Sequence, residues 1–246
     1  MKVRVSIINY SNTIPFVYGL HHNSELAQRS EFLYHYPAQA VEMLRSNQAD
    51  ISIVPVAAIP SIPNGRIISN FCIGALQHVD SVRLCSPVDL PHIQRITLDY
   101  QSRSSNLLTK VLAQYVWNIN PQFERGTQGY ETLSNNSAKV IIGDRALQYK
   151  DSFAHTWDLA QEWYKAFAKP FVFACWVANK DIPADYLQLF EQALRYGVAH
   201  IDEAIAYHNT PKTFDIHTYL HNAVSYEFDE KKQEALQLFY RLAEGV

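Results

Sequence analysis

Glycine is scarce in this chain of 246 residues, which contains only 8 of them, whereas an average composition of roughly 7% would give about 17. Neither the GxGxxG pattern of dinucleotide-binding turns nor the GxxxxGK[ST] pattern of phosphate-binding loops occurs. Such glycines are needed where the backbone approaches a phosphate closely. The sequence therefore excludes the two common glycine-rich nucleotide sites.

Cysteine is also sparse, with Cys72, Cys85 and Cys175 forming no CxxC pair. An odd number of cysteines argues against a disulfide framework. Cys85 and Cys175 lie in apolar runs, so we expect them to be buried as small hydrophobic residues. This cysteine usage favours a protein of a reducing compartment.

A surplus of positive charge is missing, because 21 Lys and Arg face 24 Asp and Glu, for a formal net charge of −3. Nucleic acid is therefore an unlikely partner. No run approaches 18 apolar residues, and the start, MKVRVSIINYSN, lacks the apolar core of a secretory signal. We expect a cytoplasmic protein without a membrane or nucleic-acid partner, and its hydrophobic fraction of 48% predicts a packed core.

Short apolar runs alternate with segments of helical periodicity along the chain. Strands are predicted at residues 3–8, 51–54, 67–75, 79–85, 95–98, 139–142 and 171–178. Helices are predicted after Pro15 and at residues 37–47, 106–117, 146–149, 157–167, 184–207 and 229–244. This alternation indicates an α/β protein with parallel sheets.

Polar loops follow three of the predicted strands, at residues 9–13, 99–105 and 143–144. Ligands of open α/β sheets bind outside the carboxyl ends of strands, where helix N-termini present free N–H groups and a positive dipole. We therefore expect two lobes that face each other across a cleft for a small anion.

The loop at residues 102–105 has the composition of an anion site. Ser102, Ser104 and Ser105 offer hydroxyls and Arg103 a guanidinium at a predicted helix N-terminus, where donors and dipole favour a carboxylate or phosphate. The alternative is that one serine caps the helix while Arg103 forms a surface ion pair.

Other candidate residues also lie at strand ends. Ser11, Asn12 and Thr13 form a polar cluster after the first strand, and helix capping explains only part of it. The Asn12 amide can donate and accept, but an amide is a poor general base. Gly143 permits close approach of a ligand to the backbone, and Asp144 could accept from a ligand hydroxyl or cap a helix. Further cleft candidates beside the fourth strand are Ser81 and Ser86.

The histidines favour no metal site. His217 and His221 have the i, i+4 spacing of a metal-binding pair, but the intervening glutamate of HExxH is absent and the sequence marks no third ligand. No GxSxG nucleophile motif occurs either. We therefore predict neither a metal nor a serine nucleophile.

Several blocks of the chain together resemble one family. They are SIINYSNTIPF at residues 6–16 with YGL at 18–20, DISIVPVA at 50–57, FCIGA at 71–75, SRSS at 102–105, IGDRA at 142–146 and PFVFACW at 170–176. In this order they resemble the MqnA family, the chorismate dehydratases of the futalosine route to menaquinone. Ser11 stands where that family usually has leucine.

The resemblance implies a two-lobed type II periplasmic-binding-protein-like fold with a ligand cleft between the lobes. Lobe one would contain residues 1–86 and 179–246 and lobe two residues 90–174, with crossovers near 86–90 and 174–178. Chorismate would be the small-molecule substrate, with no cofactor, and the oligomeric state is left open. The resemblance gives Asn12 a catalytic role beside the reacting carbon or hydroxyl. Substrate-binding residues would be Ser11, Thr13, Pro55, Ser81, Ser86, Ser102, Arg103, Ser104, Ser105, Gly143 and Asp144.

Three alternatives use the same cleft. One is a non-catalytic protein that binds a small anion, although a transport receptor would need the signal peptide that is not evident here. Another is the related naphthoate-forming enzyme, whose N-terminal motif is absent. A third is a ligand-sensing regulatory domain, which the lack of a helix-turn-helix or basic segment disfavours.

Overall fold

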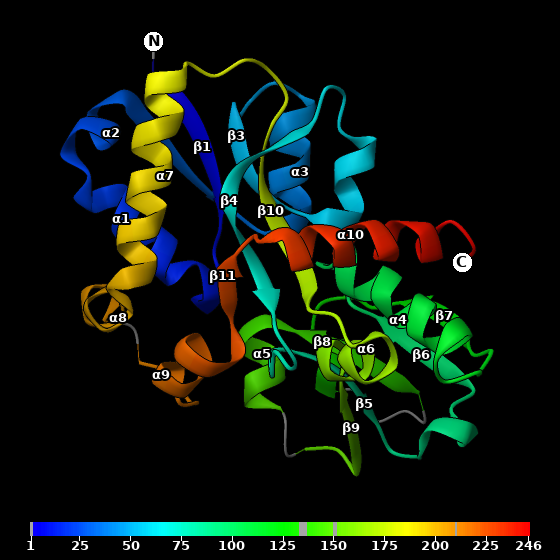
Figure 1. The fold of residues 1–246 in the computed structure, drawn as a ribbon. Helices are drawn as coiled ribbons and strands as arrows, with labels where there is room; N and C mark the ends of the chain where they lie inside the picture. The colour runs from blue at the N-terminus through cyan, green and yellow to red at the C-terminus, as the bar shows by residue number, and fades with distance from the viewer. Residues whose placement is uncertain (1, 133–136, 150–151, 210) are drawn as a thin grey trace. The chain divides into compact units, whose positions relative to one another are not determined.

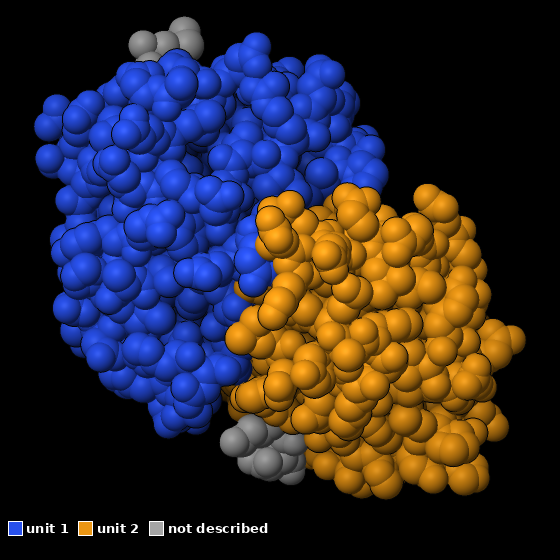
Figure 2. All heavy atoms as spheres, viewed as in Figure 1, with its two compact units in different colours: residues 1–74, 172–229 blue, residues 75–171, 230–246 orange. Residues whose placement is uncertain are grey.

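The computed structural model describes residues 2–132, 137–149, 152–209 and 211–246. The chain forms two compact units, of residues 1–74 with 172–229 and of residues 75–171 with 230–246 (Figure 2). Each unit contains one β-sheet with helices packed on it (Figure 1). None of the helices in the described chain is long and apolar enough to span a lipid bilayer.

The first unit is built on a six-stranded mixed sheet with the order β11-β4-β10-β3-β1-β2. The strands are β1 (Val3–Ile8), β2 (Ser30–His35), β3 (Ile51–Pro55), β4 (Arg66–Ala75), β10 (Phe171–Ala178) and β11 (Ser225–Glu227). β1 is parallel to β2 and β3, whereas β10 is antiparallel to β3. In this sheet the predicted parallel pairing is found in the β3-β1-β2 part, whereas the β10–β3 and β11–β4 pairs are antiparallel.

The helical elements of the first unit connect these strands. They are η1 (Ser11–Thr13), α1 (Ile14–His22), α2 (Ser24–Arg29), α3 (Pro37–Arg45), η2 (Val56–Ser61), α7 (Ala184–Ala199), α8 (Ile201–His208), α9 (Ile216–Thr218) and the π-helical turn η5 (Tyr219–Ala223). The single helix predicted at 184–207 is wrong, because the backbone of His200 leaves the helical region at φ −127° and ψ 50°.

Helices α1 and α7 cross at two glycines. A Cβ added to Gly19 would lie 1.9 Å from the carbonyl oxygen of Ala193, and one added to Gly197 would lie 1.8 Å from that of Pro15. Both distances are far below van der Waals contact, so the crossing requires hydrogen at both positions. This crossing fixes α1, whose N-terminus follows the polar loop after β1.

The second unit is built on a five-stranded mixed sheet with the order β7-β6-β8-β5-β9. The strands are β5 (Val82–Ser86), β6 (Arg95–Leu98), β7 (Gln122–Arg125), β8 (Ala138–Ile142) and β9 (His155–Asp158). The helices are η3 (Leu90–His92), α4 (Ser104–Tyr115), η4 (Tyr130–Thr132), α5 (Gly143–Gln148), α6 (Leu159–Phe167) and α10 (Glu230–Ala243). The helix predicted from residue 157 begins instead at Leu159 as α6. Asp158 is the last residue of β9, and its side chain caps the N-terminus of α6.

The unit boundaries differ from the lobe boundaries expected from the sequence. The chain changes unit between residues 74 and 75, 171 and 172, and 229 and 230. Residues 75–86 therefore belong to the second unit, because β5 pairs with β8 and β9. The C-terminal helix α10, which was assigned to lobe one, also belongs there. Its Phe239 lies 5.1 Å from Phe171 and 6.1 Å from Trp163, measured between ring centroids.

Candidate functional site

In the first unit, the polar cluster lies at the carboxyl edge of the parallel strands. β1 ends at Ile8 and is parallel to β3, which ends at Pro55, so residues 9–13 and Pro55 share this edge. The antiparallel β10 brings Ala174 beside Pro55. Ser11 is buried. This is the sheet edge at which α/β proteins bind ligands.

Asn12 and Thr13 differ in how their side chains are used. The Thr13 hydroxyl lies 2.6 Å from the carbonyl oxygen of Ile8 and 2.8 Å from that of Tyr10, so its proton is donated within the loop. The partly buried Asn12 amide makes no hydrogen bond to any described residue. The structure therefore leaves Asn12 available for a ligand and gives Thr13 a structural role.

In the second unit, three of the predicted segments meet at one sheet edge. β6 and β8 are parallel, so the loop at 99–103 and Gly143 follow strand ends on the same side. β5 is antiparallel to β8, with Val82 opposite Ile142, which places Ser81 at this edge. The Gly143 N–H donates to the Ser81 carbonyl oxygen at 2.7 Å. Ser81, the serine loop and Gly143 thus belong to one edge.

Ser86 does not belong to this group. It lies at the other end of β5, where it is opposite His155 of β9. The residue before it, Cys85, is opposite Lys139 near the start of β8. Its hydroxyl accepts from the Val88 N–H at 3.1 Å and shapes the turn after the strand. Antiparallel pairing thus sends Ser81 and Ser86 to opposite ends of β5, and Ser86 as a cleft residue stays a prediction.

The serine loop forms the start of α4. The Ser102 hydroxyl accepts from the Ser105 N–H at 3.1 Å, so Ser102 caps the helix. Ser104 and Ser105 are buried in the first turn. The Ser105 hydroxyl has no hydrogen-bond partner among the described residues, whereas exposed Arg103 forms no ion pair with them. One serine therefore caps the helix, as the alternative interpretation expected, and the anion site at this loop stays a prediction.

Gly143 begins α5 with a φ of +61°, a conformation that side chains with a Cβ rarely adopt. Asp144 follows in the first turn and is partly exposed. The Gly143 N–H is used by the Ser81 carbonyl oxygen, whereas a carboxylate such as that of Asp144 can accept a hydrogen bond from a ligand hydroxyl or from water. The local geometry therefore agrees with close approach of a ligand at Gly143.

Sequence reasoning missed an ionic cluster behind this edge. Arg145 donates to Asp99 at 2.7 Å and to the Gln101 side chain at 3.0 Å, and it also pairs with Glu131. Its guanidinium lies 5.1 Å from the ring centroid of Tyr100. Arg145 thereby ties the loop before the serines to α5 and η4. The motif IGDRA contained this arginine, but no sequence signal indicates the direction of its side chain.

Asp99 is the buried centre of this cluster, with 1% of its surface exposed. It accepts from the Tyr130 hydroxyl at 2.9 Å and from the Gln101 N–H at 2.7 Å. Burial raises the pKa of Asp99 above its usual value, and Arg145 and the two hydrogen bonds partly offset this. Burial also raises the pKa of Tyr130. The cluster is therefore a rigid support rather than a source of an exposed base.

All three cysteines are buried and none forms a disulfide, and the burial of Cys85 and Cys175 was expected. Burial raises the pKa of the Cys85 thiol to about 12, so this thiol is not a nucleophile at neutral pH. A group that could bind a metal does occur among the described residues: Asp202, His217 and His221 lie together on the surface of the first unit.

The comparison with protein families gives one match over almost the whole chain. A family model described as menaquinone biosynthesis matches residues 3–245. A chorismate dehydratase of Thermus thermophilus is 27% identical over 214 residues, which cover 79% of this chain and 77% of that protein. The residues matched by the family model include the blocks that carried the sequence resemblance.

Solved structures share the fold at low sequence identity. A protein of Archaeoglobus fulgidus aligns with a TM-score of 0.74 and 18% identity, covering 99% of this chain and 97% of its own. A Candida albicans protein described as having the generic periplasmic binding protein fold gives 0.65 and 16%, covering 100% and 91%. The alkanesulfonate-binding protein of Xanthomonas axonopodis gives 0.69 and 12%, covering 98% and 93%. The chain therefore has a periplasmic-binding-protein-like α/β fold, as predicted.

Proposed function

The chain belongs to the menaquinone biosynthesis family, and from that premise we propose that it is a chorismate dehydratase, a carbon–oxygen lyase that converts chorismate into 3-[(1-carboxyvinyl)oxy]benzoate. The observation that carries this proposal is the similarity to the Thermus thermophilus chorismate dehydratase over most of both chains. We further propose that the reaction takes place in the cytoplasm and uses no cofactor.

The chemistry explains why no cofactor is required. The C–H bond at the ether-bearing ring carbon breaks, and its electron pair forms the third ring double bond. The neighbouring C–O bond breaks at the same time or afterwards, and the hydroxyl leaves as water after taking up a proton. Because the ring becomes aromatic, the elimination is strongly favourable. The protein has to position the substrate, stabilise developing negative charge and pass one proton.

Proposed substrate contacts are assigned in each unit by itself. Ser104 and Ser105, with the first-turn N–H groups of α4, would bind a carboxylate of chorismate, and Asn12 would contact the reacting carbon or hydroxyl. The unused side chains of Asn12 and Ser105 support this assignment. Pro55 would be a further substrate contact of the first unit, and Ser81, Gly143 and Asp144 would be further contacts of the second. Thr13 is left out because its hydroxyl proton is donated within its own loop, and Ser86 because it lies at the other end of β5 from Ser81.

Ser102 and Arg145 support the serine loop in this proposal. Ser102 caps α4, and Arg145 connects the loop to α5 and η4. Arg145 already faces the carboxylates of Asp99 and Glu131, so its charge is neutralised and does not attract a further anion. We therefore assign Arg145 a positioning role. The proton acceptor is not assigned to a side chain; an enolpyruvyl carboxylate of the substrate, oriented by Asn12, could take the proton.

The alternative is a non-catalytic protein that binds a small carboxylate. It is favoured by the similarity to solved binding proteins such as the alkanesulfonate-binding protein of Xanthomonas axonopodis. The two functions share the anion-binding loop but differ in turnover.

Incubation with chorismate separates the two. We expect purified protein, without added nucleotide or metal, to form a product lighter than chorismate by one water, detected by liquid chromatography with mass spectrometry. Prephenate, which chorismate forms spontaneously, has the mass of chorismate and is thereby distinguished. Intact chorismate together with a raised melting temperature would instead support the binding protein. If the protein neither converted chorismate nor changed its melting temperature with it, both functions would be contradicted.

A further inference from the structure

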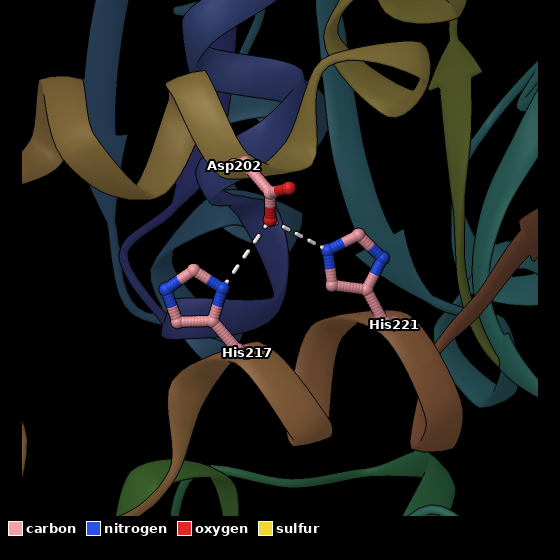
Figure 3. Close-up of side chains that lie close together, drawn as sticks. All are labelled: Asp202, His217 and His221. Atoms are coloured by element: carbon pink, nitrogen blue, oxygen red, sulfur yellow. Dashed lines mark hydrogen bonds and ion pairs between the residues drawn. The ribbon is translucent and has the colours of Figure 1, made fainter.

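Asp202, His217 and His221 converge on the surface of the first unit (Figure 3). Oδ1 of Asp202 lies 2.8 Å from Nε2 of His221 and 3.2 Å from Nδ1 of His217. The carboxylate comes from the first turn of α8, and the imidazoles come from α9 and η5. One atom of each side chain lies within 4.8 Å of the others.

The local helix geometry brings the two imidazoles together. Residues four apart lie on one helix face, and the rings of His217 and His221 are nearly parallel, with centroids 6.5 Å apart. His221 lies in a π-helical turn, a feature that is frequent at functional sites. Asp215 caps α9 by accepting from the Thr218 N–H at 3.0 Å, which fixes the turn that carries His217.

The spacing fits a small divalent cation. Zinc binds imidazole nitrogen and carboxylate oxygen at about 2.0–2.1 Å in a tetrahedron, so its ligand atoms lie about 3.4 Å apart. The Asp202–His217 distance is close to this value, and the Asp202–His221 distance would widen by a side-chain rotation. Two imidazoles and a carboxylate are the donors that zinc prefers when cysteine is absent.

We propose that Asp202, His217 and His221 form a zinc site, with the remaining coordination position open to water. The HxxxH pair alone offered no third ligand in the sequence. The structure supplies the third ligand, Asp202, which lies in α8, 15 residues before His217 in the sequence.

An ordinary acid–histidine contact does not explain the cluster equally well. His92 and Asp89 form such a contact on the second unit, at the surface and without another ligand. At Asp202 a single oxygen faces two ring nitrogens, and each of these hydrogen bonds requires a proton on that nitrogen. A metal ion replaces both protons and satisfies all three groups at once.

Zinc would join α8 to α9 and η5. This segment leads directly into β11, the edge strand that pairs with β4. Because the ligands lie on two separate helical segments, binding would restrain the chain between them and stabilise the first unit. The site is thus a structural clip, and its existence does not depend on the proposed reaction.

Calorimetric titration of tag-free, chelator-treated protein with zinc chloride tests the site. We expect saturable binding of one equivalent, with the affinity reduced about tenfold or more in His217→Ala and in Asp202→Asn. His92→Ala is the matched control, since it removes an exposed histidine paired with an aspartate and should leave zinc binding unchanged. Cobalt absorption should report tetrahedral coordination in the wild type and lose intensity in the two site variants.

Absence of saturable binding up to about 1 mM zinc, a concentration far above that at which protein zinc sites fill, would overturn the proposal. Retention of full affinity in both site variants would also overturn it, because the metal would then bind elsewhere. The titration does not use chorismate, so failure of the proposed reaction leaves its outcome unaffected.

Discussion

Asn12 and Asn23 are a natural pair for comparison at the scale of single residues. Both are partly buried asparagines near helix starts of the first unit: Asn12 lies within η1, which leads into α1, and Asn23 directly precedes α2. Oδ1 of Asn23 accepts from the Leu26 N–H at 3.0 Å and caps α2. The Asn12 amide has no partner among the residues that the model describes. The same side chain therefore caps a helix at Asn23 and makes no hydrogen bond to a described residue at Asn12, the residue for which we propose substrate contact.

Substitution of the two asparagines should produce opposite effects. Asn12→Ala is expected to lower kcat for chorismate by about 10²–10³ through loss of a positioned polar group, with little change in stability. Asn23→Ala should cost about 1 kcal/mol of stability through loss of the cap, with turnover unchanged. Urea denaturation measures the stability of both variants, and a chorismate assay measures their turnover. Full turnover in Asn12→Ala would remove its catalytic role.

Asp50 should govern part of the acid sensitivity of the first unit. It accepts from the Arg4 N–H at 2.8 Å and pairs with the Arg4 guanidinium and with Lys180. Burial opposes ionisation, but these partners prevail and lower the pKa of Asp50 to about 2. A carboxyl whose pKa is depressed on folding stabilises the protein above its unfolded pKa of about 3.9, and this contribution disappears as the pH falls through 2.

Asp50→Asn should therefore lose about 1–2 kcal/mol at pH 7, allowing for solvent screening of the partly exposed cations. The gap to the wild type should narrow from about pH 5 toward pH 2. Denaturant titrations at pH 7, 5 and 3 measure this difference in unfolding free energy between the wild type and Asp50→Asn. Asp181→Asn is the matched control, because Asp181 pairs with Arg66 at a fully open surface and should contribute little. A gap that does not change with pH would contradict this explanation.

The residues at strand ends could be predicted only in part. Asn12 and Ser105 were identified because short polar side chains followed apolar runs, a pattern that needs no knowledge of strand direction. Ser81 and Ser86 flank the same strand and looked equivalent, yet antiparallel pairing with β8 separates them. The partners of Arg145 come from two separate segments, the loop with Asp99 and Gln101 and the turn with Glu131, so their meeting depends on tertiary structure alone.

At the scale of elements, the strands that the sequence pattern missed are the outer strands of both sheets, β2, β11, β7 and β9. Each of these is partly exposed along its length. The inner strands β3, β8 and β10 are buried at every position and read as continuous apolar runs. Edge strands contact neighbours on one side only, so they retain polar residues and lose the periodicity on which prediction depends.

The α1–α7 crossing gives a prediction in which two physical effects have opposite signs. Helix propensity alone would make Gly19→Ala stabilising by about 1 kcal/mol. The new methyl group would collide with the Ala193 carbonyl oxygen at 1.9 Å, and backbone atoms cannot rotate away. We expect a net loss of about 3 kcal/mol or more, as for overpacked cores, measured by thermal and urea denaturation.

Gly245→Ala is the control for this substitution. The nearest atom to its added Cβ is the Tyr115 hydroxyl, at the end of a side chain that can turn aside. Stability should therefore change by less than about 0.5 kcal/mol. If Gly19→Ala were as stable as Gly245→Ala, α1 and α7 could move apart without loss of stability. The explanation from their close crossing would then be contradicted.

At the scale of the whole molecule, the family resemblance implied two lobes, one of them built from separate stretches of the chain. The unit boundaries in the structure differ from the lobe boundaries that it implied. Helix α10 was amphipathic in the sequence, and amphipathicity says that a face is buried but not against which partner. In the structure, Phe239 of α10 packs against Trp163 and Phe171 of the second unit. The last helix therefore returns the chain to the second unit after the first is complete.

Phe239→Ala tests this assignment. Removal of the fully buried ring should cost about 3–5 kcal/mol, and the loss should be concentrated in the unit that contains its contacts. Hydrogen exchange followed by mass spectrometry should show faster exchange in peptides from α4 and α6, while peptides from β1 and β3 keep their protection.

Phe190→Ala is the reciprocal variant, because this equally buried ring lies 5.0 Å from Trp176 in the first unit. Its substitution should accelerate exchange in β1 and β3 and spare α4 and α6. Each variant thus controls for the general loss of stability that the other causes. If Phe239→Ala loosened β1 and β3 as much as α4, α10 would act as part of the first unit, and the lobe assignment expected from the sequence would hold instead.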